Sequence, residues 1–405
     1  MIDYKIVKIT DLGTVNRGKS KHRPRNDSIL YGGKYPFIQT ADVKRANLYL
    51  SDYSQTYNEI GLKQSKLWKK GTLCFTIAAN IADSAILDMD ACFPDSIVGF
   101  LPYENISDVI YVKYLFDQLK LYFQQISKGT TQDNLSLDKI CRVKLRVPNY
   151  ETQKKIASVL AVYDNLIENN NKRIKLLEQM VENLYKEWFV RFRFPGFENV
   201  KFEEDIPSNW NYVQLGNIVS FERGISYSSK EINCDDGINL VNLKNIQSYG
   251  GFRREGTKKY NGKYKDSQIV NAGDLILGVT DMTQDRRTVG SVALIPVIDG
   301  TSVISADLVK IESKVPNQFL YCMCRYGFYS KYFSQFANGA NVLHLKPNTL
   351  LNKKVLLPTE DLIETFTKKV IPMVDIVDKI NLQNDILIKQ RDYLLPRLMS
   401  GKLES

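Results

Sequence analysis

The first residues with a recognisable chemistry run from Gly13 to Ser20, which fit the pattern of a phosphate-binding loop letter for letter. In such a loop the backbone and a lysine, here Lys19, would hold the phosphates of a nucleotide. The loop must open a helix whose first amides face the phosphates, but the residues that follow lack apolar periodicity and include Pro24. The matching position in the second half of the chain, after Gly224, has no lysine. The sequence therefore argues against a nucleotide-dependent enzyme, which would rest on this motif alone.

Other catalytic patterns are weaker still. The chain has no Pro-Pro dipeptide, which the Asn-Pro-Pro-Tyr type of adenine methyltransferase motif needs, and no glycine-rich S-adenosylmethionine loop after a strand. The two histidines, His22 and His344, lie far apart, and the six cysteines contain no Cys-x-x-Cys pair. Four aspartates lie close in sequence without a nuclease pattern: Asp83, Asp88, Asp90 and Asp95. We therefore predict no catalytic residue, no metal site and no cofactor bound by this chain.

The positive charge is more informative. The formal net charge is +10, from 55 basic and 45 acidic residues. Two clusters stand out, one in each half: Arg17, Lys19, Lys21, Arg23 and Arg25, and then Arg253, Arg254, Lys258, Lys259, Lys263 and Lys265. Clustered lysine and arginine on loops are typical of phosphate binding, because each contact releases condensed counterions. A basic loop kept for solubility would look the same, but two clusters in two halves favour nucleic acid.

The chain is also built as a repeat. An extended stretch ends at Pro148 and again at Pro358, about 210 residues later, and each time a long helical pattern follows. Asn149 and Thr359 are good N-cap types for these helices. A duplicated unit in one chain is a covalently fused dimer, which suits a target made of two parts.

Both helices carry a heptad seam. The first seam is Leu160, Tyr163, Ile167, Asn170, Ile174, Leu177, Val181, Leu184 and Trp188, and the second is Met373, Ile376, Ile380, Gln383, Leu387, Gln390 and Leu394. If the helices pack antiparallel and the shared polar position lies near the middle, the amides of Asn170 and Gln383 could meet and fix the register. The alternative is that both are ordinary core helices of one domain.

The globular halves repeat more faintly. Tyr35–Gln39 resembles Ile238–Asn242, and Lys70–Leu73 resembles Ala272–Leu275. A glycine loop precedes each repeated helix, at Gly129–Leu135 and Gly339–Leu345. Short β-type runs separated by Gly and Asn predict a mixed sheet with helices in each half, and the differing loop residues suggest two similar scaffolds with different contacts.

At this point the sequence resembles a known family, the specificity subunits of type I restriction-modification systems. The resemblance rests on Gln153–Ile156, Leu184–Phe192, Phe194–Gly196, Asp205–Trp210, Leu215–Ile218 and Leu394–Leu403, and covers essentially the whole chain. Two features depart from the family pattern. The first half lacks the Pro-x-x-Trp start of the second, and the second helix begins with Ile363–Phe366 in place of Gln-Lys-Lys-Ile.

The resemblance implies an α+β fold: two mixed α/β target recognition domains joined by two long helices that form an antiparallel coiled coil, with a pseudo-twofold internal repeat. The expected domains are a first target recognition domain (1–148), a central conserved helical region (149–193), a second target recognition domain (194–357) and a C-terminal conserved helical region (358–405).

It also implies a function. Each target recognition domain would read one half of a bipartite, asymmetric site in double-stranded DNA, while the helices act as a spacer and docking surface for two methyltransferase subunits. Those partners would carry S-adenosylmethionine, and a restriction subunit that translocates DNA would use ATP and Mg. With no apolar run of 18 residues and no signal peptide, we expect a cytoplasmic chain without membrane contact.

Helix length predicts the spacing of the two half-sites. The 27 residues from Tyr163 to Phe189 would span about 40 Å as a helix, close to the ~34 Å of one DNA turn. We therefore predict two blocks of roughly three to five base pairs with a gap of about five to eight.

The residues expected to contact DNA are the basic clusters and neighbouring amides and hydroxyls. They are Arg17, Lys19, Lys21, Arg23, Arg25, Gln39 and Thr40 in the first half, and Arg223, Tyr227, Asn242, Lys244, Arg253, Arg254, Arg286 and Arg287 in the second. Tyr185, Phe189 and Phe192 are expected to form an exposed helical face that binds a partner subunit. A free-standing DNA-binding regulator is the alternative function. It would explain the charge and the duplication, but it would not need such a face.

Overall fold

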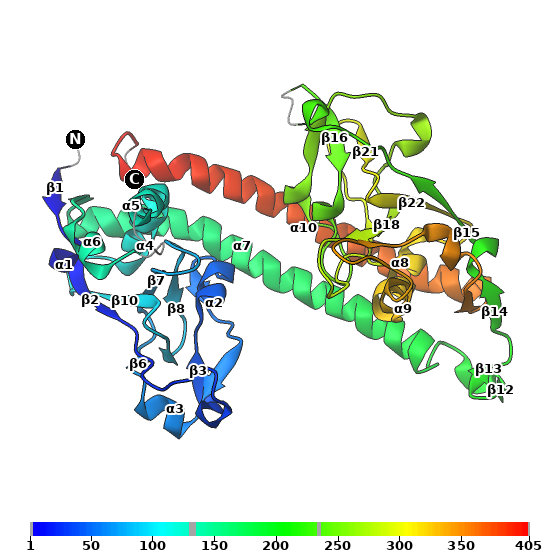
Figure 1. Ribbon diagram of the computed structural model, residues 1–405, viewed down its shortest axis with the longest axis horizontal. Helices are drawn as coiled ribbons and strands as arrows, with labels where there is room; N and C mark the ends of the chain where they lie inside the picture. The colour runs from blue at the N-terminus through cyan, green and yellow to red at the C-terminus, as the bar shows by residue number, and fades with distance from the viewer. Residues whose placement is uncertain (1–2, 129–134, 233–235, 404–405) are drawn as a thin grey trace. The chain divides into compact units, whose positions relative to one another are not determined.

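The structure is a computed structural model that describes residues 3–128, 135–232 and 236–403, and it divides into two compact units (Figure 1). Unit 1 consists of Met1–Lys172 and Leu382–Ser405, and unit 2 of Arg173–Asn381. Both units include parts of the two long helices, α7 (Tyr150–Tyr185) and α10 (Glu360–Met399). Each unit therefore combines one globular half with a segment of each helix.

The globular part of unit 1 contains three sheets and short helices. The antiparallel pair is β1 (Tyr4–Val7) with β11 (Leu145–Pro148). The five-stranded sheet has the order β2 (Gly13–Arg17), β10 (Ile97–Pro102), β7 (Leu73–Thr76), β8 (Ser84–Leu87) and β4 (Tyr49–Leu50). The four-stranded sheet has the order β5 (Gln55–Tyr57), β3 (Tyr31–Phe37), β9 (Ala91–Cys92) and β6 (Leu67–Trp68). The helices are α1 (Ile9–Leu12), α2 (Thr40–Arg45), α3 (Glu59–Lys63), α4 (Val109–Gln118), α5 (Lys120–Ser127) and α6 (Leu137–Arg142).

The described part of unit 2 contains three strand pairs and two larger sheets. The pairs are β14 (Asn211–Gln214) with β24 (Lys354–Leu357), β19 (Thr280–Asp281) with β23 (Leu343–His344), and β12 (Phe202–Glu203) with β13 (Ile206–Pro207). One sheet has the order β15 (Val219–Arg223), β22 (Leu308–Ser313), β18 (Leu275–Gly278) and β20 (Val292–Leu294). The other has the order β17 (Lys258–Tyr260), β16 (Ile238–Val241) and β21 (Ser302–Ile304). Its main helices are α8 (Asn317–Tyr326) and α9 (Tyr329–Ser334).

These sheets confirm the internal repeat. The order β2-β10-β7-β8 corresponds to β15-β22-β18-β20, and β3 pairs in parallel with β9 as β16 does with β21. The register confirms the sequence comparison as well. Tyr35 lies opposite Tyr57 in unit 1, and Ile238 lies opposite Tyr260 in unit 2. The predicted fold class, two mixed domains with two long helices, is therefore confirmed.

The two helices pack antiparallel within unit 1, as predicted. In Figure 1 the red end of α10 runs beside the first part of α7, and side-chain contacts join Asp164 to Arg391 and Asn170 to Asn384. Nδ2 of Asn170 donates to Oε1 of Gln383 at 3.2 Å and to Oδ1 of Asn384 at 2.9 Å. The meeting of Asn170 and Gln383 is therefore confirmed, and such an amide pair favours one register over its neighbours.

The second seam differs from the prediction at several positions. Asn384 is buried while Gln383 is exposed, and Arg391 is more buried than Gln390. Ile376, also placed in the seam, is 41% exposed. Asn384 and Arg391 face inward because their side chains satisfy buried polar groups on α7. A pattern of apolar residues does not predict such contacts.

Candidate nucleic-acid interface

In each unit, two loops leave the same edge of the main sheet. In unit 1, β2 and β7 are both antiparallel to β10, and their last residues Arg17 and Thr76 lie opposite Val98 and Ile97. In unit 2, β15 and β18 end in the same way against β22, with Arg223 opposite Val309 and Gly278 opposite Leu308. We call this border the loop edge. It carries residues 18–29 and 77–83 in unit 1 and residues 224–231 and 279–291 in unit 2.

A third segment joins the loop edge of both units through an equivalent hydrogen bond. The Leu135 N–H donates to the carbonyl of Ile77 at 3.0 Å, and the Leu345 N–H donates to the carbonyl of Val279 at 2.8 Å. These are the ends of the two glycine loops predicted from the sequence. Residues 129–134 of the first loop lie outside the described residues, whereas Gly339–Leu345 is described and contains β23.

The phosphate-loop reading of Gly13–Ser20 does not fit this geometry. Gly13–Arg17 forms strand β2, and residues 18–27, all of them described, contain no helix. A phosphate-binding loop needs a helix N-terminus at this point. This segment therefore lacks the helix N-terminus on which a phosphate-binding loop depends.

The basic loop of unit 1 is fixed to the segment after α3. Oε1 of Gln64 accepts hydrogen bonds from the Lys21 N–H at 2.6 Å and from the His22 N–H at 3.1 Å. The Ser65 hydroxyl donates to the carbonyl of Lys19 at 2.7 Å. These bonds bring two segments, more than 40 residues apart in sequence, to one surface.

Two further lysines join the surface in this way. Lys63 and Lys66 flank the anchoring Gln64 and Ser65, and Nζ of Lys66 lies 3.7 Å from the centre of the Trp68 ring. We define patch 1 as four exposed lysines that make no ion pair within the described part of the chain: Lys19, Lys21, Lys63 and Lys66. Sequence reasoning missed Lys63 and Lys66, because only the folded loop brings them close to the cluster.

The other basic residues of the first cluster hold the loop together. Nη1 of Arg23 donates to the carbonyls of Ser20 and His22, each at 2.8 Å. Nη2 of Arg25 donates to both carboxylate oxygens of Asp95, at 2.7 and 2.9 Å. Arg17 is exposed at the end of β2. Direct contact of these three arginines with DNA remains a prediction.

Unit 2 has a basic surface at the equivalent place. Nε2 of Gln268 donates to the carbonyl of Arg223 at 3.2 Å, which ties the end of β15 to the short helical turn Asp266–Gln268. This turn follows the exposed Lys263 and Lys265. We define patch 2 as Arg223, Lys263 and Lys265. As in unit 1, a glutamine links two basic segments that are distant in sequence.

Several predicted DNA-contacting residues of unit 2 are engaged inside the protein. Asn242 is buried, and its amide donates to the carbonyl of Gly256 at 2.7 Å while its oxygen accepts the Lys244 N–H at 3.0 Å. Arg254 forms an ion pair with Asp378 of α10 and donates to the carbonyl of Val297 at 2.9 Å. The expectation that Asn242 and Arg254 are free to meet DNA is therefore wrong, because each fills a structural bonding position that the sequence does not reveal.

The remaining candidates keep accessible atoms. Gln39 and Thr40 are half-buried at the start of α2, where Nε2 of Gln39 donates to Oε1 of Gln55 at 2.6 Å. Lys244, Arg253 and Arg287 are exposed, Tyr227 is half-buried beside Lys258, and Arg286 donates to the carbonyl of Ser334 at 2.5 Å. DNA contacts by these residues stay predictions.

The prediction that Tyr185, Phe189 and Phe192 form an exposed face for a partner subunit is wrong. Tyr185 and Phe189 are only 4% and 8% exposed, and Phe192 is half-buried. The ring of Phe189 lies 5.3 Å from that of Phe319 and 4.8 Å from that of Phe366. These aromatic side chains form the core between α7, α8 and α10 in unit 2, so they present no docking surface in this arrangement.

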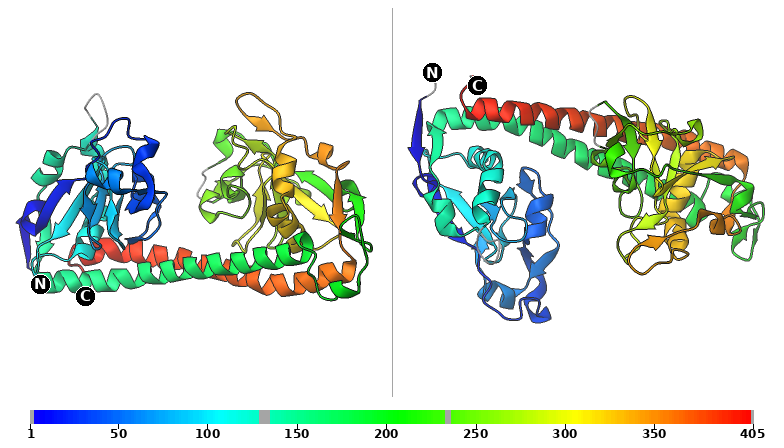
Figure 2. Two further views of the ribbon diagram at one scale, coloured as in Figure 1. Left: turned by 90° about the horizontal axis from the view of Figure 1, so that it is seen from below. Right: turned by 45° about the horizontal axis from the view of Figure 1, so that its top comes forward.

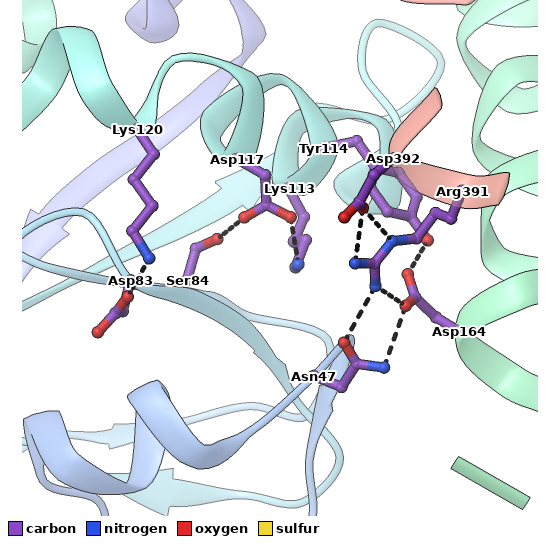
Figure 3. Close-up of polar contacts among 10 residues, drawn as sticks. All are labelled: Asn47, Asp83, Ser84, Lys113, Tyr114, Asp117, Lys120, Asp164, Arg391 and Asp392. Atoms are coloured by element: carbon purple, nitrogen blue, oxygen red, sulfur yellow. Dashed lines mark hydrogen bonds and ion pairs between the residues drawn. The ribbon is translucent and has the colours of Figure 1, made fainter. Parts of the chain in front are cut away.

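A buried polar network fastens the globular part of unit 1 to its helices (Figure 3). The Asp164 carboxylate on α7 accepts hydrogen bonds from Arg391 of α10 at 2.5 Å, from the Tyr114 hydroxyl at 2.5 Å and from Asn47 at 3.0 Å. Burial, followed by the neighbouring Asp164, raises the pKa of Tyr114 above its ordinary value. The network thus joins α4, the segment after α2, and both long helices in one site.

The four aspartates noted in the sequence do not form a cluster. Each pairs with a different basic residue: Asp83 with Lys120, Asp88 with Lys70, Asp90 with Lys69 and Asp95 with Arg25, at 2.6 to 2.8 Å. Across residues 3–128, 135–232 and 236–403, no group of three His, Cys, Asp or Glu side chains is placed to hold a metal ion. Among the helices of these same residues, none has the length and apolar character to cross a membrane.

Comparisons with known proteins agree with this architecture. Residues 1–179 match the type I restriction modification DNA specificity domain. The chain is 26% identical to the MjaIX type I restriction enzyme specificity subunit of Methanocaldococcus jannaschii, over 99% of this chain and 94% of that protein. It is 21% identical to the HindI specificity subunit of Haemophilus influenzae, over 97% and 98% of the two chains.

A solved structure shares the fold. The type I restriction-modification S subunit from M. genitalium matches with a TM-score of 0.61 at 15% identity, covering 98% of this chain and 96% of that one. The sequence similarity to the two specificity subunits extends over nearly the whole chain, and the match to the specificity domain covers residues 1–179. The chain is therefore similar in sequence to type I restriction-modification specificity subunits and shares the fold of one of them.

Proposed function

We propose that this chain is the non-catalytic DNA specificity subunit of a type I restriction-modification complex, and that its two units read the two halves of a bipartite, asymmetric site. The observation that carries the proposal is the loop edge. Both units have the same strand order and the same anchoring bonds there, but different side chains on the loops. Two like scaffolds with unlike contacts suit two different DNA sequences.

The paired positions next to the loop edge illustrate the difference. The Gln39 N–H donates to Asp42 at 2.8 Å, and the equivalent Asn242 N–H donates to Asn245 at 2.9 Å, so the backbone turn is the same. The neighbouring strands then present Gln55 and Thr56 in unit 1 where unit 2 has Lys258 and Lys259. Patches 1 and 2 would contact phosphates, and such loop residues would contribute base contacts.

Selection from a randomised DNA duplex library tests this function. We expect the purified full-length chain, alone and with its methyltransferase subunits, to select two blocks of roughly three to five base pairs with a gap of about five to eight. A single contiguous palindrome would contradict the bipartite function. Equally tight, specific binding by the chain alone, with no association with methyltransferase subunits, would favour the free-standing regulator.

We further propose that the partner subunits dock on an apolar stripe of the unit 1 helices. Along α7, the seam residues face α10, while Ala157, Ala161 and Asp164 face the globular part. A third face carries Val159, Val162 and Leu166, which are 36%, 54% and 42% exposed. Figure 2 shows that the strands and short helices of unit 1 lie on one side of its helix pair, which leaves the opposite side uncovered.

The second half of α10 also carries exposed apolar side chains. Ile386 and Tyr393 are exposed and lie seven residues apart, so they share a face of the helix. The contacts of Asp164 with Arg391 and of Asn170 with Asn384 set the antiparallel register, which brings the 159–166 stretch level with these turns. An exposed apolar stripe on a helix pair is suited to packing against an apolar helix. The occupant that we propose is a helix of a methyltransferase subunit, and S-adenosylmethionine, ATP and Mg would be bound by partners.

Charge substitution tests the stripe. Leu166→Glu combined with Ile386→Glu is expected to weaken association with the methyltransferase subunit by about 30-fold or more, the effect of losing an interface hot spot. Association is measured by co-purification and by titration calorimetry. Leu121→Glu, at an exposed apolar position of α5, is the matched control. Unchanged association with intact DNA binding in the double variant would exclude this face.

A further inference from the structure

The loop between β19 and β20 in unit 2 is held by a buried carboxylate. Oδ1 of Asp281 accepts the N–H and the hydroxyl of Thr283, both at 2.9 Å. Oδ2 of Asp281 accepts the N–H of Thr288 at 2.6 Å and that of Val289 at 3.3 Å. Asp281 is 3% exposed, so it closes the loop from inside and fixes both of its ends. The loop therefore presents residues 282–287 on a rigid base.

Two polar side chains of the loop bond to neighbouring backbone carbonyls. Nε2 of Gln284 donates to the carbonyl of Ala340 at 2.6 Å, and Nη1 of Arg286 donates to the carbonyl of Ser334 at 2.5 Å. The Arg286 backbone is left-handed, with φ of +55°. A non-glycine residue in this conformation persists only where its surroundings hold it, and such residues concentrate at binding sites.

A second strained residue touches the same loop. The Tyr249 N–H donates to the carbonyl of Arg287 at 2.8 Å, and Tyr249 has φ of +67°. Its side chain is exposed. Two left-handed non-glycine residues thus meet at the loop edge of unit 2.

Met282 is an exposed apolar residue of this loop. Its side chain is 71% exposed, although the loop around it is ordered by its own bonds. The equivalent loop of unit 1, residues 77–83, carries Ala78 and Ala79 and no exposed large apolar side chain. The feature therefore distinguishes the two units and is not required by their common fold.

We propose that Met282 is a specificity-determining residue that contacts the methyl group of a thymine in the half-site read by unit 2. The inference rests on the proposed function. In the major groove, the C5-methyl of thymine is an apolar group that distinguishes one base pair from the others, and unbranched apolar side chains pack against it. Lys346 is exposed just after β23 of the same loop edge, and Arg287 of the loop is exposed and forms an ion pair with Asp285 at 2.6 Å. An exposed apolar side chain beside basic groups fits a DNA groove better than an apolar protein surface.

Replacing thymine by deoxyuridine tests the contact, because it removes only the methyl group. Selection with wild-type chain first defines the motif, and each thymine in both blocks is then replaced in turn. At one position we expect wild-type binding to weaken about fourfold, the effect of losing one buried methyl group. For Met282→Ala, thymine and deoxyuridine are expected to bind equally at that position. Met180→Ala, at an exposed methionine of α7, is the matched control and should behave as wild type.

The outcomes separate this inference from the function on which it rests. If the wild type selects no bipartite motif, the proposed function fails, and the role of Met282 with it. If it selects one but Met282→Ala keeps the same sensitivity to deoxyuridine, only the methyl contact is overturned. Equal loss of affinity for all sequences, random duplexes included, would likewise overturn it, since the side chain would then act without reading sequence.

Discussion

Alanine at all four lysines of patch 1 is expected to weaken duplex DNA binding by about 10³-fold at 0.15 M salt. The four residues are Lys19, Lys21, Lys63 and Lys66. Each phosphate contact adds about 0.9 to the slope of log affinity against log salt concentration, so losing four lowers the slope by roughly 3.6. Fluorescence anisotropy of a labelled duplex of about 30 base pairs, in a series of salt concentrations, measures both quantities.

Paired lysines of the same unit supply the control. Lys69 and Lys70 already form ion pairs with Asp90 and Asp88, so alanine at both should change the slope little. The Lys63→Ala, Lys66→Ala pair is the sharper test of the two residues that only the structure identifies. It should lower the slope by about 1.8 and weaken all sequences alike. A slope equal to wild type in the fourfold variant would show that patch 1 does not contact phosphates.

Features that depend on local periodicity could be predicted from the sequence. The seam of α7 follows steps of three and four residues, and the polar seam residue Asn170 does meet an amide of α10. The repeat could be read because glycines and apolar runs recur in order, and the strand orders match. Hydrophobic patterns record which face of an element is buried, and this information lies within a few residues.

Features that depend on distant partners could not be predicted in this way. Whether a polar side chain is free depends on what the sheet topology places next to it. Asn242 and Arg254 are residue types expected at a DNA surface. However, Asn242 donates a hydrogen bond to Gly256, and Arg254 forms an ion pair with Asp378. Lys63 and Lys66 are distant in sequence from the Arg17–Arg25 cluster, so only the fold shows that they belong to the same surface. Polar contacts also explain why the second seam differs from the prediction, since Arg391 faces inward to bind the buried carboxylate of Asp164.

That buried carboxylate makes Arg391 important for stability. Arg391→Ala is expected to lower the free energy of unfolding of unit 1 by about 3 to 5 kcal/mol, because it leaves the charge of Asp164 buried without its cation. The Asp164 side chain has no exposed area, and Arg391 is 18% exposed. The corresponding fall in Tm is roughly 6 to 20 °C for a unit of this size. Hydrogen exchange should report faster opening in unit 1 and unchanged protection in unit 2.

Further variants distinguish the effect of an unpaired Asp164 charge from the effect of removing a cation from α10. Lys389→Ala removes an exposed cation from the same turn of α10 and should cost little. Asp164→Leu combined with Arg391→Met removes both charges and fills the space with apolar groups, which is often neutral or stabilising for a buried pair. Asn47 and Tyr114 would then lose their acceptor, so recovery should be partial and should improve when Tyr114→Phe is added. If the double variant is as unstable as Arg391→Ala alone, packing of the arginine stem, and not the stranded charge, holds the globular part of unit 1 on its helices.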